Sequence, residues 1–233
     1  MINKAFLHQK ASEYGIELNE NQLVRLDTYA ELLVDWNTRM NLTGITEPDE
    51  IVIKHFVDSL ITAKYFDLGN THRAIDVGTG AGFPAIPLLI YKPEMEMTLM
   101  DSLQKRLTFL DEVLKQTGLD AETVHARAED AGQDPAFRER YDLACARAVA
   151  PMNVLAEYCL PFVKVGGYFV ALKGSNDDVT SAQNAIKELG GELVDYVSYK
   201  LENESRSIAI VKKISQTATK YPRKTKKISS KPL

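Results

Sequence analysis

Three alternating glycines after a short apolar segment are the clearest chemical signal in this sequence. Residues 74–84 read Ala-Ile-Asp-Val-Gly-Thr-Gly-Ala-Gly-Phe-Pro. Glycine lets the backbone turn tightly, and it lets a ligand approach without a Cβ in the way. The segment therefore predicts a strand, a glycine-rich loop and a helix that together hold a small ligand.

The spacing of the glycines distinguishes between kinds of ligand. The dinucleotide fingerprint G-x-G-x-x-G needs a third small residue at position 83, where this chain has Phe83. A P-loop needs Gly-Lys-Ser or Gly-Lys-Thr, and neither follows the loop. Asp76 followed by G-x-G-x-G instead resembles the first motif of S-adenosylmethionine (SAM) methyltransferases. A plain helix entry without a ligand remains the alternative for the loop taken alone.

A second acidic residue supports a nucleoside ligand. Asp101 ends the next apolar segment, 25 residues after Asp76, close to where Rossmann-like sites place an acid that accepts hydrogen bonds from ribose hydroxyls. The alternative is that Asp101 caps a helix beginning at Leu103. A third segment ends at residues 126–130, Ala-Arg-Ala-Glu-Asp, where a methyltransferase would cover the adenine with backbone and an acidic side chain.

Alternating apolar and helical segments after residue 70 must position these groups. We expect strands at 73–77, 97–101, 123–126, 143–146, 168–173, 193–199 and 207–212, and helices at 84–91, 103–117, 152–162 and 177–189. Only 200–206 separates the last two strands, too short for a parallel crossover, so they should form an antiparallel hairpin. The pattern predicts an α/β fold with the seven-stranded sheet of Rossmann-like SAM-dependent methyltransferases.

Helices are expected before the sheet. Apolar residues recur at three-to-four spacing from Leu23 to Trp36, with Asn19 as the N-cap. A second helix should begin after Thr46 as its capping residue and run to Leu60. We expect an N-terminal helical extension at 1–68, a SAM-dependent methyltransferase domain at 69–213 and a basic, flexible tail at 214–233.

Charge is distributed unevenly along the chain. The net charge of −4 combines +8 on residues 212–233 with −12 on residues 1–211. An acidic body with a short basic arm suits an enzyme that meets a polyanion, through an attraction that weakens with salt. A solubilising tail without a partner remains the alternative.

Composition excludes several other classes. A chain that is 45% hydrophobic and 26% charged is ordinary for a globular protein. It has no apolar run of about 18 residues and no signal peptide at its start, so we expect a cytoplasmic protein with no membrane partner. The two cysteines, Cys145 and Cys159, and the four histidines form no ligand motif, so we expect no metal.

Several separated strings match one family. They are Trp36-Asn37 with Asn41-Leu42-Thr43, His-Phe-Val-Asp-Ser-Leu at 55–60, the loop at 76–84, Arg-Ala-Glu at 127–129, Ala-Arg-Ala-Val-Ala at 146–150, Leu-Lys-Gly at 172–174 and Lys-Tyr-Pro-Arg at 220–223. They lie in order over almost the whole chain. On these strings the sequence resembles the bacterial small-subunit ribosomal RNA guanine-N7 methyltransferases, the family called RsmG or glucose-inhibited division protein B.

The resemblance implies a cofactor, a substrate and a set of residues. It implies SAM held by Gly78, Phe83, Ala128, Glu129 and Arg147, to which the loop and the strand end add Gly80 and Asp101. It also implies methylation of N7 of one guanine in the decoding-region loop of 16S rRNA, with the rRNA or the small ribosomal subunit as partner. Guanine N7 can attack without first losing a proton, so the enzyme's task is alignment, and Arg147 is the best candidate for positioning.

Basic residues near strand ends and in the tail are the candidates for RNA contact. They are Arg147, Lys173, Arg206, Arg223 and Lys224. Removal of residues 221–233 should therefore weaken RNA binding and its salt dependence while sparing SAM affinity. His55 and Asp58 lie one helical turn apart, a spacing that favours a packing or capping pair over a role at the substrate mouth.

Other target chemistries lack their motifs. The Asn-Pro-Pro-Tyr motif of amino-group methyltransferases is replaced by Cys-Ala-Arg-Ala at 145–148, and Cys145 lacks the preceding proline typical of cytosine-C5 enzymes. A non-catalytic RNA-binding protein on the same fold remains an alternative, as does a small-molecule methyltransferase. We expect a monomer.

Overall fold

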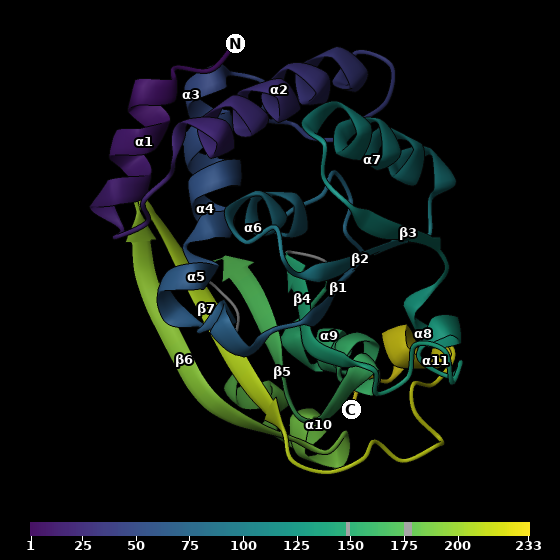
Figure 1. Ribbon diagram of the computed structural model, residues 1–233. Helices are drawn as coiled ribbons and strands as arrows, with labels where there is room; N and C mark the ends of the chain where they lie inside the picture. Colours follow the sequence, from purple (N-terminus) through teal and green to yellow (C-terminus); the bar gives the residue numbers. More distant parts are fainter. Residues whose placement is uncertain (148–149, 175–178) are drawn as a thin grey trace.

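A seven-stranded sheet forms the centre of the protein in the computed structural model (Figure 1), which describes residues 1–147, 150–174 and 179–233. The strands are β1 (Arg73–Val77), β2 (Glu96–Asp101), β3 (Ala121–His125), β4 (Tyr141–Arg147), β5 (Val163–Gly174), β6 (Gly191–Leu201) and β7 (Glu204–Lys213). Their order is β3-β2-β1-β4-β5-β7-β6. β7 runs antiparallel to both of its neighbours. The predicted seven-stranded α/β fold and its final hairpin are confirmed.

Each predicted strand overlaps a strand of the structure, and the ends differ by a few residues. β1 has the predicted bounds, whereas β5 begins at Val163, five residues before the predicted start. Gly166 and Gly167 follow this early start, and such a glycine pair is typical of a turn. In the structure the pair lies within a strand whose register with β4 shifts between Tyr141 and Leu143.

Two layers of helices cover the faces of the sheet (Figure 1). The first layer contains α1 (Lys4–Glu13), α2 (Glu20–Asn37), α3 (Pro48–Ile51), α4 (Asp58–Leu60), α5 (Thr62–Tyr65), α6 (Ala85–Tyr91) and α7 (Gln104–Thr117). The second contains α9 (Met152–Cys159) and α10 (Gln183–Glu188). Two short helices, α8 (Ala128–Ala131) and α11 (Thr225–Ser230), lie near the end of α9.

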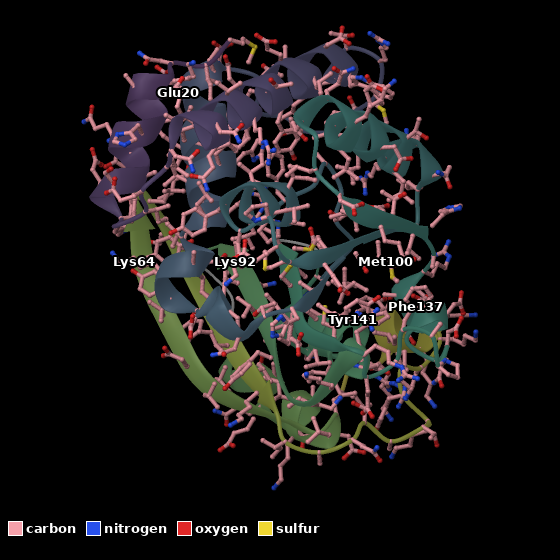
Figure 2. The ribbon with its side chains drawn as sticks, in the orientation of Figure 1. Glu20, Lys64, Lys92, Met100, Phe137 and Tyr141 are labelled. Carbon is pink, nitrogen blue, oxygen red and sulfur yellow. The ribbon has the colours of Figure 1, made fainter. Side chains whose placement is uncertain are left out.

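Neighbouring strand residues alternate between the two layers, as period-two side chains must. Ala74 belongs to the core under α6 and α7, and Ile75 to the core under α9. The labelled side chains of Met100 and Tyr141 in Figure 2 belong to the second layer. Because residues of α1, α2 and α4 share one core with the sheet, the N-terminal helices have no separate core of their own among the described residues.

The helices before the sheet confirm one predicted cap and correct another. Asn19 caps α2 in a capping box with Gln22, as expected. The next helix has Glu47, not Thr46, as its N-cap. Pro48 occupies the first turn and forces the residue before it into an extended conformation, which makes Glu47 the boundary.

This second helix changes its winding in the middle. α3 passes into a π-helical segment, Val52–Val57, before α4 begins at Asp58. π-helical turns are rare and occur often at functional sites. His55 lies in this widened segment, which bears on the site described below.

The predicted helix at 177–189 is shorter in the structure. α10 begins at Gln183, after a 3₁₀ turn at Thr180–Ala182. Asp177 and Asp178, expected in its first turn, lie outside the described residues. Valine, threonine and serine at 179–181 have lower helix propensity than the residues that follow, which accounts for the later start.

The C-terminal segment is held against the body, in contrast to the flexible tail expected for 214–233. Arg138 donates to the carbonyl oxygens of Thr217 at 2.6 Å and Tyr221 at 2.8 Å. The side chains of Tyr221 and Ile228 are buried, at 5% and 0% exposure. The hydrogen bonds and the buried side chains tie this basic segment to the body.

Two compositional expectations concern the membrane and the cysteines. Over residues 1–147, 150–174 and 179–233, the structure has no helix with the length and hydropathy needed to cross a bilayer. Cys145 and Cys159 are free and buried. Burial raises the pKa of the Cys145 thiol well above its usual range, which agrees with a structural strand cysteine.

Candidate functional site

The glycine loop leads from the carboxyl end of β1 into α6. The N–H groups of Gly78 and Thr79 both donate to the carbonyl of Met100 at 2.9 Å, which ties the loop to β2. A Cβ on Gly82, which has φ +99°, would lie 2.7 Å from Ile86 Cγ1. A Cβ on Gly80, with φ +62°, would meet nothing nearer than a carbonyl oxygen at 3.9 Å. Gly82 thus permits close packing of the loop, whereas Gly80 leaves open space where a ligand can approach.

Asp76 holds this loop from inside the core. Its side chain is fully buried, and Thr79 Oγ1 donates to its Oδ2 at 2.8 Å. Burial raises the pKa of Asp76 to about 7, although the Thr79 hydrogen bond acts in the opposite direction. The motif acid therefore shapes the loop and lies beneath it.

Asp101 joins the end of β2 to the loop. Its Oδ2 accepts from the N–H of Gly80 at 3.0 Å and from Arg106 Nη1 at 3.2 Å. Its Oδ1 accepts from the N–H of Leu103 at 2.9 Å. Asp101 therefore makes the local contact expected of a residue preceding a helix, and it also faces the cavity next to the loop.

A cavity of about 540 Å³ lies at the carboxyl ends of β1, β2 and β4, the edge where open α/β sheets hold ligands. All seven residues expected to hold the cofactor line it: Gly78, Gly80, Phe83, Asp101, Ala128, Glu129 and Arg147. Its volume lies within the range of about 300 to 1,000 Å³ for small-molecule sites. The structure thus brings the predicted set together around one space, while the role of each residue stays a prediction.

Phe83 carries two charged or polar side chains on its ring. The His55 ring stacks on it, with centroids 4.3 Å apart, and the Arg147 guanidinium lies 4.6 Å from its centroid. Arg147 is further held by Lys54 O at 3.2 Å and Asp58 Oδ2 at 3.3 Å. These contacts fix the Arg147 side chain in the cavity wall.

His55 is neutral in this setting. Burial, with the Arg147 charge as the second cause, lowers the pKa of His55 to about 3. Arg147 Nη2 lies 3.1 Å from Nδ1, which must accept, so Nε2 carries the proton and donates to Thr43 Oγ1 at 2.8 Å. The imidazole is therefore an orienting group with little basicity.

The loop after α2 brings Thr43 to this position. Asn37 Oδ1 accepts from the N–H groups of Leu42 and Thr43 at 2.8 and 3.0 Å. Leu42 and Thr43 both line the cavity. The separated strings around Trp36 and His55 thus meet in space at the glycine loop.

The sequence comparisons agree with this geometry. A family model described as rRNA small subunit methyltransferase G matches residues 22–209. A ribosomal RNA small subunit methyltransferase G from Alkaliphilus metalliredigens is 48% identical over all of both chains. The protein of the same name from Brevibacillus brevis is also 48% identical over all of both chains. The chain belongs to this family. Membership confirms the predicted family, the methyltransferase class and SAM as the methyl donor.

Solved structures share the fold. A SAM-dependent O-methyltransferase from Thermotoga maritima aligns with a TM-score of 0.54 at 17% identity, covering 79% of this chain and 72% of that one. The M. jannaschii protein TYW2, solved in complex with AdoMet, aligns with a TM-score of 0.51 at 16% identity, covering 62% and 70%. The seven-stranded architecture of this methyltransferase therefore recurs in distant proteins.

A second cavity of about 370 Å³ adjoins the first in this methyltransferase and shares His55 and Arg147 with it. Two further RNA candidates, Lys173 and Arg206, line it. Arg206 Nε lies 3.6 Å from Asp58 Oδ1, so Asp58 stands between Arg147 and Arg206. The structure thus brings three of the five RNA candidates together, and their contact with RNA stays a prediction.

Lys173 is less accessible than a surface lysine. The residue is 5% exposed and its Nζ donates to the carbonyl of Ala150. Burial lowers the pKa of Lys173 below its usual range. Lys173 nevertheless lines the second cavity.

The remaining two RNA candidates lie in the C-terminal segment, apart from the second cavity. Arg223 forms a two-pronged ion pair with the buried carboxylate of Glu157, which favours a structural role over RNA contact. Lys224 pairs with Asp130 at 2.8 Å on the surface, where its side chain is 83% exposed.

Some residues of the site were missed by the sequence reasoning. His55 and Asp58, expected to form a packing or capping pair, instead contact Arg147, and His55 lines both cavities. Tyr158 and Thr225 line the first cavity without any signal in the sequence. His55 and Asp58 both belong to the matching string at 55–60, and this was the available signal that they lie at the site.

Proposed function

We propose that this protein is a monomeric cytoplasmic enzyme that methylates N7 of one guanine in the decoding-region loop of 16S rRNA, with SAM as the donor. The observation that carries the proposal is the wall between the two cavities. Arg147 and His55 belong to both, so the cofactor cavity adjoins a cavity rich in basic side chains. A methyl donor on one side would thus meet a polyanionic acceptor on the other.

The residues present fit SAM. A Cβ on Gly80 would meet nothing nearer than 3.9 Å, which leaves room for a ligand, and the Asp101 carboxylate in the same cavity is an acceptor for ribose hydroxyls. Met100 and Ala126 supply apolar wall for an adenine, and Glu129 supplies an acceptor. Bound there, SAM supplies an electrophilic methyl group on a sulfonium.

The side chains would position the guanine and leave its protonation unchanged. N7 has an in-plane lone pair that needs no base, and the nearby imidazole of His55, with a pKa of about 3, is a poor base. Arg147 is the group that can direct the base, because guanidinium groups bind the O6 and N7 edge of guanine or a phosphate. Its fixed orientation reduces the freedom lost when the acceptor binds.

The second cavity would hold the RNA backbone near the reacting base. Lys54, Lys173 and Arg206 line it, and the ion pairs of Lys54 and Arg206 with Glu204 leave the two side chains 30% and 21% exposed. Phosphate contacts of this kind position a nucleic acid and weaken as salt rises.

The test is methyl transfer from labelled SAM to small-subunit rRNA from cells lacking this gene, offered both as naked RNA and as subunits. Nucleoside mass spectrometry should find one N7-methylguanine, and strand cleavage at that base should map it to the decoding-region loop. Arg147→Ala, assayed in parallel, should abolish most of the transfer. SAM binding without transfer to either substrate would overturn the rRNA assignment and favour a small-molecule acceptor or a non-catalytic RNA-binding role.

A further inference from the structure

The C-terminal segment supplies part of the wall of the cofactor cavity. Thr225, the first residue of α11, lines the same cavity as Gly80 and Asp101. Tyr158 of α9 also lines it, and Ser229 of α11 lies close enough to act on the pKa of the Tyr158 hydroxyl. Figure 1 shows α11 beside α8 and α9. The cavity is therefore closed on one side by residues more than 60 positions apart in the sequence.

One buried ion pair docks this segment. Arg223 Nε lies 2.8 Å from Glu157 Oε1, and Nη2 lies 2.6 Å from Oε2. The N–H of Arg223 also donates to Oε1 at 2.8 Å. The Glu157 side chain is fully buried, and that of Arg223 is 12% exposed. Removal of either partner leaves a buried charge unpaired, so the pair specifies where the segment docks.

Both residues of the ion pair lie close in the sequence to a residue that lines the cavity. Glu157 immediately precedes Tyr158 in α9, and Arg223 lies two positions before Thr225. Arg223 Nη1 also donates to the carbonyl of Lys231 at 3.1 Å, which closes the segment around α11. A shift of Arg223 would therefore move two cavity-lining side chains.

A second set of contacts secures the stretch before Arg223. Gln133 Nε2 donates to the carbonyls of Thr219 at 3.2 Å and Pro222 at 3.0 Å. Pro222 packs against Gly132. A Cβ added to Gly132 would lie 2.9 Å from Pro222 Cγ. Gly132 directly follows α8, the helix that carries Glu129 into the cavity. The segment thus braces α8 as well as α9.

We propose that docking of residues 217–233 completes the SAM site, and that Arg223 is a positioning residue for the cofactor. The inference rests on the proposed function for its ligand. It contradicts the expectation that removal of residues 221–233 spares SAM affinity, because Thr225 is part of the cavity wall. SAM binding and docking of the segment are then coupled, and each favours the other.

The test is calorimetry with SAM on full-length protein carrying Arg223→Gln or, as the matched control, Lys226→Gln. Both variants remove one positive charge from the same segment, but the Lys226 side chain is exposed in α11. Arg223→Gln should raise the Kd for SAM by about 5- to 150-fold, the usual range of such couplings. Lys226→Gln should leave the Kd within about twofold, as expected for an exposed charge. If Arg223→Gln does not fold, Arg223→Lys replaces it, because an ammonium cannot make the two-pronged contact.

A double-mutant cycle tests whether Arg223 and Glu157 act through their ion pair. Glu157→Gln alone should also weaken SAM binding, whereas Arg223→Gln combined with Glu157→Gln should recover most of the affinity because no buried charge is left unpaired. In the methylation assay, Arg223→Gln should raise KM for SAM and leave kcat at saturating SAM near the wild-type value.

Two results would overturn the inference: an unchanged Kd in folded Arg223→Gln protein, or an equal rise in Lys226→Gln. Failure of the wild-type protein to bind SAM would instead refute the proposed function, so the two failures are distinguishable.

Discussion

Arg147 Nη2 lies 3.1 Å from His55 Nδ1, and both side chains lie on the ring of Phe83. The contact joins the end of β4 to the π-helical segment that precedes the sheet. The N-terminal helices are therefore part of the site wall, since they deliver the imidazole that orients the arginine. Replacing Arg147 should therefore change the pKa of His55.

In the Arg147→Ala variant the pKa of His55 should rise from about 3 toward its usual value of 6.5. The positive charge that opposes imidazole protonation is gone, but burial, the larger cause, keeps the rise incomplete. NMR titration of the His55 ring resonances in both proteins measures the change. Identical His55 titrations would show that Arg147 does not act on this ring.

Replacing Asp101 by Ala should weaken SAM binding by about 10- to 150-fold, which corresponds to the loss of about 1.5–3 kcal/mol from charge-assisted hydrogen bonds. The carboxylate also holds Gly80 and Leu103, so thermal unfolding must be recorded beside calorimetry. Asp111→Ala is a control, because Asp111 lies on α7 and bonds Thr123 away from the cavity. An unchanged Kd in folded Asp101→Ala protein would remove this residue from the cofactor site.

Gly80→Ala and Gly82→Ala should damage different properties. Both have positive φ, which costs about 1–2 kcal/mol for alanine. At Gly82 the new methyl group also meets Ile86, Leu110 and Tyr29 within 3 Å, so stability should fall by about 1–3 kcal/mol more. At Gly80 the methyl group enters the open cavity, so Gly80→Ala should lower SAM affinity. Its loss in melting temperature should be smaller than that of Gly82→Ala. Equal melting temperatures for the two variants would contradict this division.

The stability of the protein should depend on the ionisation of Asp76. With a pKa raised from 3.8 to about 7, Asp76 keeps its proton in the folded state while the unfolded chain loses it. Between pH of about 4 and about 7 the unfolded chain therefore binds fewer protons than the folded protein. Because of this difference, the contribution of Asp76 lowers the free energy of unfolding as pH rises, by at most about 1.4 kcal/mol per pH unit. Asp76→Asn keeps an acceptor for Thr79 and removes the titration.

Urea unfolding of wild type and Asp76→Asn at pH 5 and pH 8 measures the effect. The free energy of unfolding of Asp76→Asn, relative to that of wild type, should be higher at pH 8 than at pH 5. A difference that is the same at both pH values would place the Asp76 pKa outside this interval.

Local patterns in the sequence were sufficient for the elements and for the cofactor loop. Alternating apolar residues and short connections predicted the seven strands, and the 200–206 connection was too short for anything but a hairpin. The family resemblance supplied five of the seven expected cofactor residues, and all seven lie at or after strand ends, which parallel strands bring to one edge. The strands, the hairpin and the glycine loop depend on neighbours in the sequence, so the sequence alone determined them.

Contacts between distant segments were decided only by the tertiary structure. The Arg147–His55 contact spans 92 positions, and the Arg223–Glu157 pair spans 66. Charge alone predicted that Arg223 would face RNA in a flexible tail, yet the buried carboxylate of Glu157 holds it against the body. A charged residue in a sequence does not reveal its partner, because the pairing depends on which helix faces are brought together when the core forms. Burial then sets the strength of each pairing and the pKa of each group, and burial is a property of the folded chain.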